Sequence, residues 1–186
     1  MNNQLKKERL IILSDLWGKE KSEWISYYTS LLENHFDIHY YDCCDLGNID
    51  KSEYSEKQLH QQFITIGIQK AVENILQKEQ EKVHVLGFSI GGTIAWKAAI
   101  SGLKTKSIFA ISSTRLRIET NQPLGIIELF YGANDTYQPD EDWFLKMDIK
   151  RHIYENENHN MYQKRAIAED ICTKIIKMSQ NHRSNI

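Results

Sequence analysis

Apolar and polar positions follow two periods along this chain, and together they predict strands that alternate with helices. Six short apolar runs are typical of strands buried on both faces of a sheet. These strands are expected at residues 10–13, 36–41, 83–86, 106–111, 124–131 and 148–154. Segments with apolar residues at helical spacing lie between and after them, at 24–32, 59–76, 91–101, 140–146 and 161–178. Residues 42–56 are polar and charged, which favours a loop that could hold one helical turn.

Strands separated by helices imply a mostly parallel six-stranded sheet covered by helices on both faces, which is a three-layer α/β/α arrangement. The chain has 186 residues, only two prolines and no linker rich in Ser and Gly. A chain of this length buries about 70% of its unfolded surface, enough to fold without a disulfide or a metal. We therefore expect a single domain over residues 1–186, with its core at about 9–178.

The most informative segment is 83–92, which reads Val-His-Val-Leu-Gly-Phe-Ser-Ile-Gly-Gly and leads from an apolar strand into a helix. The pattern Gly87-x-Ser89-x-Gly91 in this setting is typical of a nucleophile elbow, a sharp turn that exposes a serine hydroxyl. Such a turn strains the serine backbone and needs small neighbours so that strand and helix can approach. The alternative is a Gly-rich turn with a purely structural role.

An acid and a histidine follow the serine in the loops after later strands. In an open parallel sheet, functional groups lie at the carboxyl ends of the strands, and Asp135 and His159 follow the fifth and sixth expected strands. A serine hydroxyl needs a base such as imidazole, and a carboxylate fixes the imidazole tautomer. We predict Ser89 as nucleophile, His159 as base and Asp135 as orienting carboxylate. Asp135 as a simple turn residue and His159 as a surface histidine remain alternatives. Asp140 and Asp142 are better explained as the first turn of a helix.

With these residues in place, the chain resembles a small α/β-hydrolase over residues 9–178. The order Ser89, Asp135, His159 is the order of that family, Gly132-x-x-Asp135 is similar to its acid loop, and His159 is expected to open the last helix. The resemblance implies an α/β-hydrolase fold with strand order 2-1-3-4-5-6. It also implies a serine esterase-like hydrolase that cleaves small or medium carboxylic esters or thioesters through an acyl-enzyme. The link at 112–123 is too short for the cap domain that many relatives insert there.

The family stabilises its oxyanion with two backbone N–H groups, and the resemblance places them at Ile90 and Leu16. Ile90 directly follows the nucleophile. Leu16 aligns best in the loop after the first strand, with Trp17 as the neighbouring choice.

Asp15 is where this chain departs from its relatives, many of which carry a His-Gly pair at this point. A carboxylate near the oxyanion would weaken catalysis unless it points away or is neutralised, for example by Lys19 or Lys21. Asp15 therefore supports a competing hypothesis, in which the protein is a catalytically silent α/β-hydrolase-fold binding protein.

Five aromatic side chains lie in or next to the expected loops: Trp17, Phe88, Tyr131, Tyr137 and Trp143. We expect Trp17, Phe88 and Tyr137 to line a substrate pocket, although aromatics at such spacings are often core residues. Arg115 and Arg117 follow the fourth strand. A solvated loop explains these two cations better than a contact with an anionic substrate.

Composition limits the partners. The formal net charge is −2, with both signs mixed along the chain, so we expect a small-molecule acyl substrate and neither nucleic acid nor a membrane surface. The three cysteines have no metal-ligand spacing, and the N-terminus lacks the apolar region of a signal peptide, which together favour a cytoplasmic protein without metal or cofactor. A flavodoxin-like nucleotide binder is disfavoured because no lysine follows the glycines. The sequence does not indicate an oligomeric state.

Overall fold

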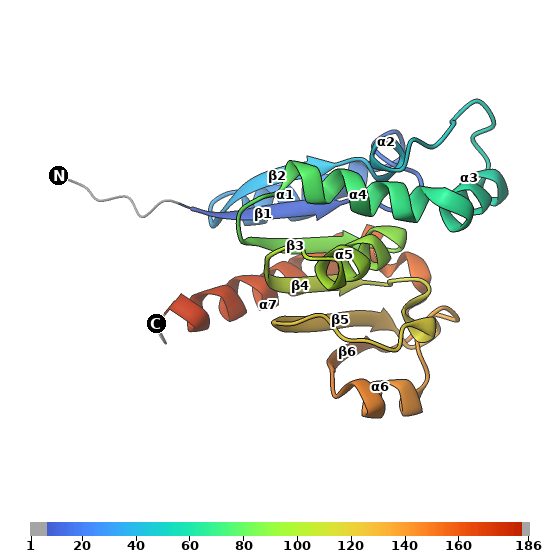
Figure 1. Ribbon diagram of the computed structural model, residues 1–186. Coiled ribbons are helices and arrows are strands. Elements are labelled where there is room, and N and C mark those ends of the chain that lie inside the picture. Colours follow the sequence, from blue (N-terminus) through green and yellow to red (C-terminus); the bar gives the residue numbers. More distant parts are fainter. Residues whose placement is uncertain (1–6, 184–186) are drawn as a thin grey trace.

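A six-stranded sheet organises the structure, a computed structural model that describes residues 7–183 (Figure 1). The strands are β1 (Glu8–Leu13), β2 (Phe36–Tyr41), β3 (Val83–Phe88), β4 (Thr105–Ile111), β5 (Ile126–Gly132) and β6 (Lys150–Tyr154). Their order is β2-β1-β3-β4-β5-β6, and every neighbouring pair is parallel. The fold class and the strand order predicted from the sequence are both confirmed. The strand expected at 124–131 begins later, since Leu124 is 90% exposed and lies outside β5.

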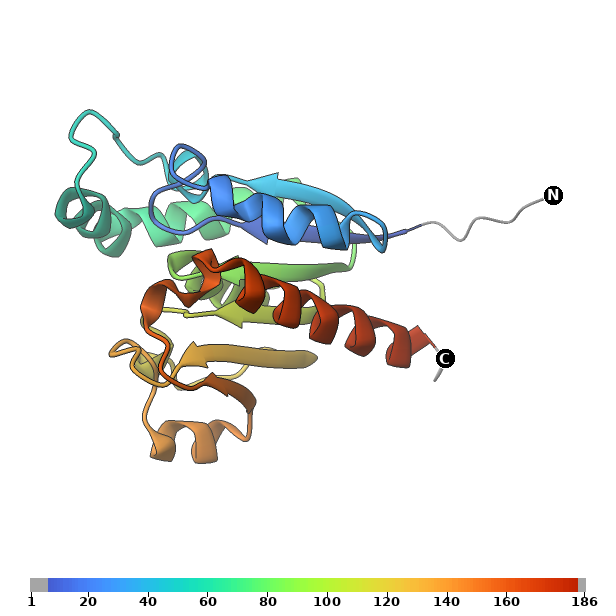
Figure 2. The same ribbon diagram turned by 180° about the vertical axis from the view of Figure 1, so that it is seen from behind.

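Helices cover both faces of the sheet, as the three-layer prediction required (Figures 1 and 2). The helices are α1 (Ser26–Leu32), α2 (Cys43–Leu46), α3 (Glu56–Gln62), α4 (Ile68–Lys78), α5 (Ile90–Ile100), α6 (Glu141–Met147) and α7 (Arg165–Arg183). Successive strand residues point to opposite faces. In β1, Leu10 and Ile12 belong to the cluster under α1 and α7, whereas Ile11 and Leu13 belong to the cluster under α4 and α5. No helix among residues 7–183 has the length and apolarity needed to cross a membrane.

The single helix expected at 59–76 is interrupted. A π-helical turn at Phe63–Gly67 separates α3 from α4. The wider turn shifts the helical phase, and Ile64 and Ile66 become 37% and 65% exposed although they fit the apolar stripe of the sequence. Gly67 permits the packing, because a Cβ there would lie 2.5 Å from Cδ1 of Ile49. α3, on the N-terminal side of this turn, lies beyond the carboxyl ends of the central strands (Figure 1).

Three other segments differ in detail from the sequence prediction. The helix expected at 24–32 opens with a 3-10 turn, Glu23–Ile25, before α1. The last helix is preceded by a separate 3-10 turn, η4 (His159–Gln163), so His159 stands just ahead of α7 instead of inside it. Within the expected loop at 42–56, α2 forms because the Asp42 carboxylate accepts hydrogen bonds from the first amides of the helix.

Candidate active site

Ser89 stands at the sharp turn between the buried strand β3 and helix α5. Its backbone has φ 50° and ψ −114°, a conformation that non-glycine residues rarely adopt. The flanking glycines are required by close contacts, because a Cβ on Gly91 would lie 2.4 Å from the Ser14 carbonyl oxygen and one on Gly87 would lie 2.7 Å from Gly91 backbone atoms. The Ser89 amide donates to the Ile111 carbonyl at 2.9 Å, which ties the turn to β4. Strain of this kind is characteristic of functional positions.

The three side chains proposed as a triad meet at one point. Nε2 of His159 lies 3.0 Å from Oγ of Ser89, and Nδ1 of the same ring lies 3.0 Å from Oδ2 of Asp135. Oδ1 of Asp135 accepts the Tyr137 amide at 2.9 Å, and the carboxylate is fully buried. A buried carboxylate held from both sides can orient the imidazole and stabilise its protonated form.

Direct contacts between two loops set the positions of the acid and the histidine. The Asn134 amide donates to the Glu157 carbonyl at 2.8 Å, and the Ala133 amide donates to the Tyr154 carbonyl at 2.9 Å. Gly132 allows this approach, because a Cβ there would lie 2.4 Å from the Glu157 carbonyl oxygen. By contrast, Asp140 caps α6 by accepting the Trp143 amide at 2.9 Å, as expected for a helix start.

Asp15 is a buried residue of the loop after β1 and is not one of the residues that line the cleft beside Ser89. Its Oδ1 accepts the Trp17 amide at 2.9 Å, and its Oδ2 accepts the Tyr162 hydroxyl at 3.1 Å. The suggested partners Lys19 and Lys21 were wrong, since their ammonium groups lie over the rings of Tyr40 and Trp17. Two neutral donors can satisfy a carboxylate without a cation.

Burial raises the pKa of the Asp15 carboxyl to about 6. The hydrogen bonds from the Trp17 amide and the Tyr162 hydroxyl, together with the charge of nearby His159, oppose this rise only in part. Burial likewise raises the pKa of the Tyr162 hydroxyl well above its usual value, so Tyr162 remains a neutral donor to Asp15.

Of the two amides suggested in the first loop, only the one of Leu16 is free for an oxyanion. The Trp17 amide is engaged by Asp15, so this alternative is excluded by the contact. Within residues 7–183, no acceptor is seen for the Leu16 amide, and Leu16 lines the cleft beside Ser89. Ile90 is the first residue of α5, where amides have no acceptor within the helix.

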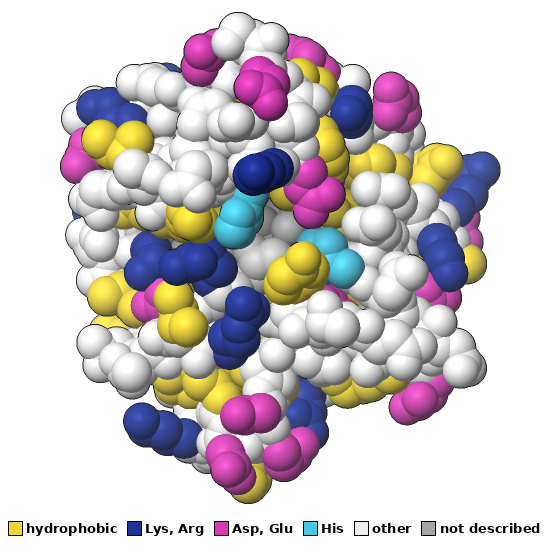
Figure 3. All heavy atoms as spheres, turned by 90° about the vertical axis from the view of Figure 1, so that its right-hand side faces the viewer, with side chains coloured by type: hydrophobic (Ala, Val, Ile, Leu, Met, Phe, Trp, Pro, Cys, Tyr) yellow, Lys and Arg dark blue, Asp and Glu magenta, His cyan; other side chains and the backbone are white. Residues whose placement is uncertain are grey.

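The cleft at this end of the sheet has a volume of about 620 Å³, and the surface there is hollowed between two histidine side chains (Figure 3). Its lining comprises Leu16, Trp17, Glu56, Lys57, His60, Ser89, Thr114, Arg115, Arg117, Tyr137, His159, Asn160 and Tyr162. Trp17 and Tyr137 therefore lie where the sequence placed them. Phe88 does not, because it is fully buried against the rings of Trp24, Tyr28 and Tyr162.

Other residues near the cleft differ from the sequence prediction or were not predicted. Tyr131 and Trp143 are core residues, as aromatics often are. Arg115 and Arg117, interpreted as a solvated loop, line the cleft instead. Glu56, Lys57 and His60 reach the cleft from α3, and no local pattern of the sequence signals this placement. Asn160 and Tyr162 could have been suggested from their nearness to His159 in the chain.

No protein-family model matches the chain, and no curated protein matches its sequence. Solved structures do match its fold. A candidate hydrolase of the α/β superfamily from Xanthomonas campestris aligns with TM-score 0.69 and 13% identity, over 94% of this chain and 99% of the other. A candidate dienelactone hydrolase from Klebsiella pneumoniae aligns with TM-score 0.71 and 14% identity, over 95% and 88%. The chain has the α/β-hydrolase fold. A structure from a study of carboxylesterases of Nitrososphaera gargenis shares this α/β-hydrolase fold at TM-score 0.68 and 11% identity, over 95% and 92%.

Proposed function

We propose that this protein is a serine hydrolase that cleaves small or medium carboxylic esters or thioesters through an acyl-enzyme. The observation that carries the proposal is the continuous contact from Ser89 Oγ through the His159 ring to Asp135, built on a strained turn. A serine, a base and an orienting acid within hydrogen-bond reach are the signature of covalent acyl transfer.

Each residue then has a defined part in the reaction. His159 Nε2 takes the Ser89 proton while Oγ attacks the ester carbonyl, and the amides of Leu16 and Ile90 receive the oxyanion. His159 returns the proton to the departing alcohol or thiol, which leaves an acyl group on Ser89. Water, deprotonated by the same ring, then releases the acid. Asp135 stays ionised and holds the ring through Nδ1.

The structural neighbours support ester chemistry through their own names, which include carboxylesterases and a candidate dienelactone hydrolase. Their sequence identities to this chain, 11% and 14%, support a shared fold but do not indicate a shared substrate. The size limit of the proposal rests on this chain's short link after β4, which holds only a single 3-10 turn at Leu116–Ile118. A link of that size cannot enclose a long acyl chain.

A fluorophosphonate probe tests the proposal directly. We expect the wild-type protein to be labelled on Ser89, and Ser89→Ala to abolish labelling. Ser101→Ala, at the exposed end of α5, is the matched control and should be labelled like the wild type. Absence of labelling in a folded wild-type protein would favour the silent binding protein.

A further inference from the structure

The cleft beside Ser89 carries an excess of positive charge on a chain whose formal net charge is −2. Lys57, Arg115 and Arg117 line it, and Glu56 is the only carboxylate among the lining residues within the described range 7–183. Figure 3 shows Lys and Arg side chains gathered along the hollow at this end of the molecule. A cleft walled by one sign of charge concentrates ligands of the other sign.

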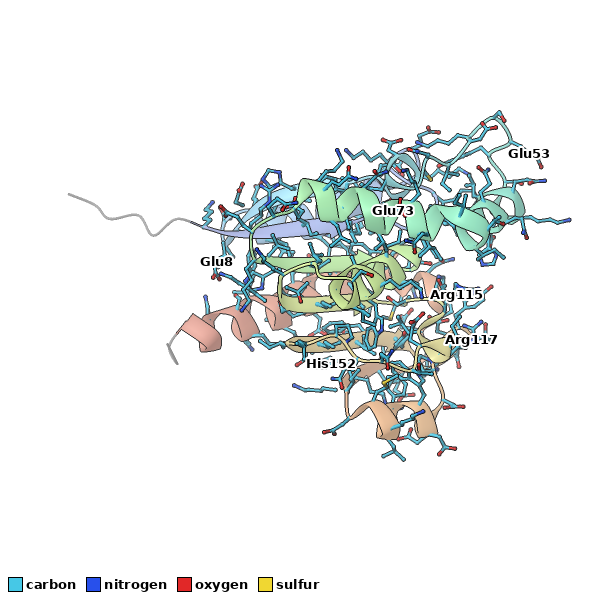
Figure 4. All side chains as sticks on the ribbon, in the orientation of Figure 1. Glu8, Glu53, Glu73, Arg115, Arg117 and His152 are labelled. Atoms are coloured by element: carbon cyan, nitrogen blue, oxygen red, sulfur yellow. The ribbon has the colours of Figure 1, made fainter. Side chains whose placement is uncertain are left out.

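The two cleft arginines differ from the other arginines whose side chains the structure describes. Arg9, Arg151 and Arg165 each pair with a carboxylate. Arg115 and Arg117 have no carboxylate partner among residues 7–183. They lie at the carboxyl end of the sheet, on the segment after β4 (Figure 4). Their guanidinium groups are therefore available to an anion that enters the cleft.

The backbone supports a dedicated placement of these side chains. Arg115 has φ 64°, a left-handed conformation that disfavours residues with a Cβ, and it is half-buried. Strained non-glycine residues are enriched at functional sites, where the surrounding structure holds them in place. Arg117 donates to the Tyr137 carbonyl at 3.1 Å, and its guanidinium lies 5.9 Å from the Tyr137 ring centre. Tyr137 in turn packs edge-on to His159 at 5.1 Å, which places Arg117 two contacts from the base.

We propose that Arg115 and Arg117 select esters or thioesters that carry a carboxylate distant from the bond that is cleaved. The inference rests on the proposed function and names its substrate class. A guanidinium presents paired N–H donors that match the two oxygens of a carboxylate, which makes arginine better suited than lysine to this contact. Lys57, on α3, adds charge to the same cleft without requiring that geometry.

Two six-carbon activated esters test the selectivity, the p-nitrophenyl half-ester of adipic acid and p-nitrophenyl hexanoate. They present the same chain length, and only the half-ester has a terminal carboxylate. We expect kcat/KM to favour the half-ester, and Arg115→Gln to reduce the ratio of the two values about tenfold. Arg115→Lys should keep part of the preference, and added salt should weaken it, since the site is open to solvent.

Arg165→Gln is the matched control, because it removes the same charge from an exposed position on α7. It should leave the ratio unchanged. An unchanged ratio in Arg115→Gln/Arg117→Gln, or an equal fall in Arg165→Gln, would overturn the inference.

Binding without turnover separates this inference from the proposed function. In Ser89→Ala the half-ester stays intact, and calorimetry should show tighter binding of the half-ester than of p-nitrophenyl hexanoate. This difference should disappear when Arg115→Gln and Arg117→Gln are added. If the protein binds the half-ester selectively but hydrolyses neither ester, the inferred carboxylate site stands and the proposed hydrolase function is wrong. If it hydrolyses both esters but binds them equally well, the hydrolase function stands and the carboxylate site is wrong.

Discussion

The buried carboxylate of Asp15 holds the loop that follows β1 through two hydrogen bonds. The sequence alone suggested that its negative charge would destabilise an oxyanion bound nearby. In the structure it closes a turn onto the Trp17 amide and accepts the Tyr162 hydroxyl, away from the cleft lining. The loop geometry that exposes the Leu16 amide therefore depends on the residue that seemed to oppose catalysis.

Asp15→Asn should stabilise the protein above pH 6. The folded pKa of about 6 exceeds the usual 3.8, so the folded state holds the proton more tightly than the unfolded state. Stability therefore falls as the pH rises from about 4 to 6, by about 3 kcal/mol in all. The asparagine side chain keeps an acceptor for the Trp17 amide and has no charge to bury. Urea unfolding of both proteins from pH 4 to 8 measures this. Equal free energies of unfolding at pH 8 would contradict the explanation, and ester turnover should change only modestly.

Replacing Asp135 by Asn should lower kcat by about four orders of magnitude, because an amide facing Nδ1 favours the wrong imidazole tautomer. Steady-state kinetics on an activated ester measures the loss. Asp140→Asn is the control, since Asn caps a helix as well as Asp does and Asp140 only caps α6. Similar kinetics in the two variants would reject Asp135 as the orienting acid.

At the scale of elements, α5 packs closely against the end of β1, next to the loop that carries Leu16, and Ile90 begins α5. Gly91→Ala would add a Cβ 2.4 Å from the Ser14 carbonyl oxygen, and backbone cannot move aside as a side chain can. Alanine favours a helix by about 1 kcal/mol over glycine, but forced separation of packed elements costs about 1–3 kcal/mol. We expect a net loss of stability together with a loss of activity.

Gly102→Ala is the informative comparison for this prediction. Gly102 has φ 113° and open space around it, so alanine there costs about 1 kcal/mol through backbone strain alone. Thermal unfolding should show both variants destabilised. Only Gly91→Ala should lose activity per folded molecule, and full activity in Gly91→Ala would contradict the role of this contact.

The elements themselves were largely predictable, because periodicity marks buried strands and amphipathic helices directly. Each expected strand appears within a few residues of its observed bounds. The π-helical turn was not predictable, since Ile64 and Ile66 fit the apolar stripe of a continuous α-helix. The placement of α3 beside the cleft could not be predicted either, because it is a tertiary contact between segments distant in the chain.

At the scale of the whole molecule, parallel strands collect distant residues at one edge. The loops holding Ser89, Asp135 and His159 could therefore be brought together from their order alone. The lining of the cleft could not, since whether Phe88 or Trp17 faces it depends on side-chain direction. The positive charge of the cleft could not be predicted either, because it comes from two segments distant in the chain, α3 and the segment after β4.

The most direct test of the central claim is detection of the acyl-enzyme. We expect rapid mixing with p-nitrophenyl acetate to give a burst of about one p-nitrophenol per protein wherever deacylation is the slower step. Acid quenching and peptide mapping should then find one acetyl group on Ser89. Ser89→Ala and His159→Ala should both abolish the burst, and the double variant should turn over ester little more slowly than either single variant, because the groups act as a unit. A burst without an acetyl group on Ser89, or ester turnover retained in Ser89→Ala, would contradict the account.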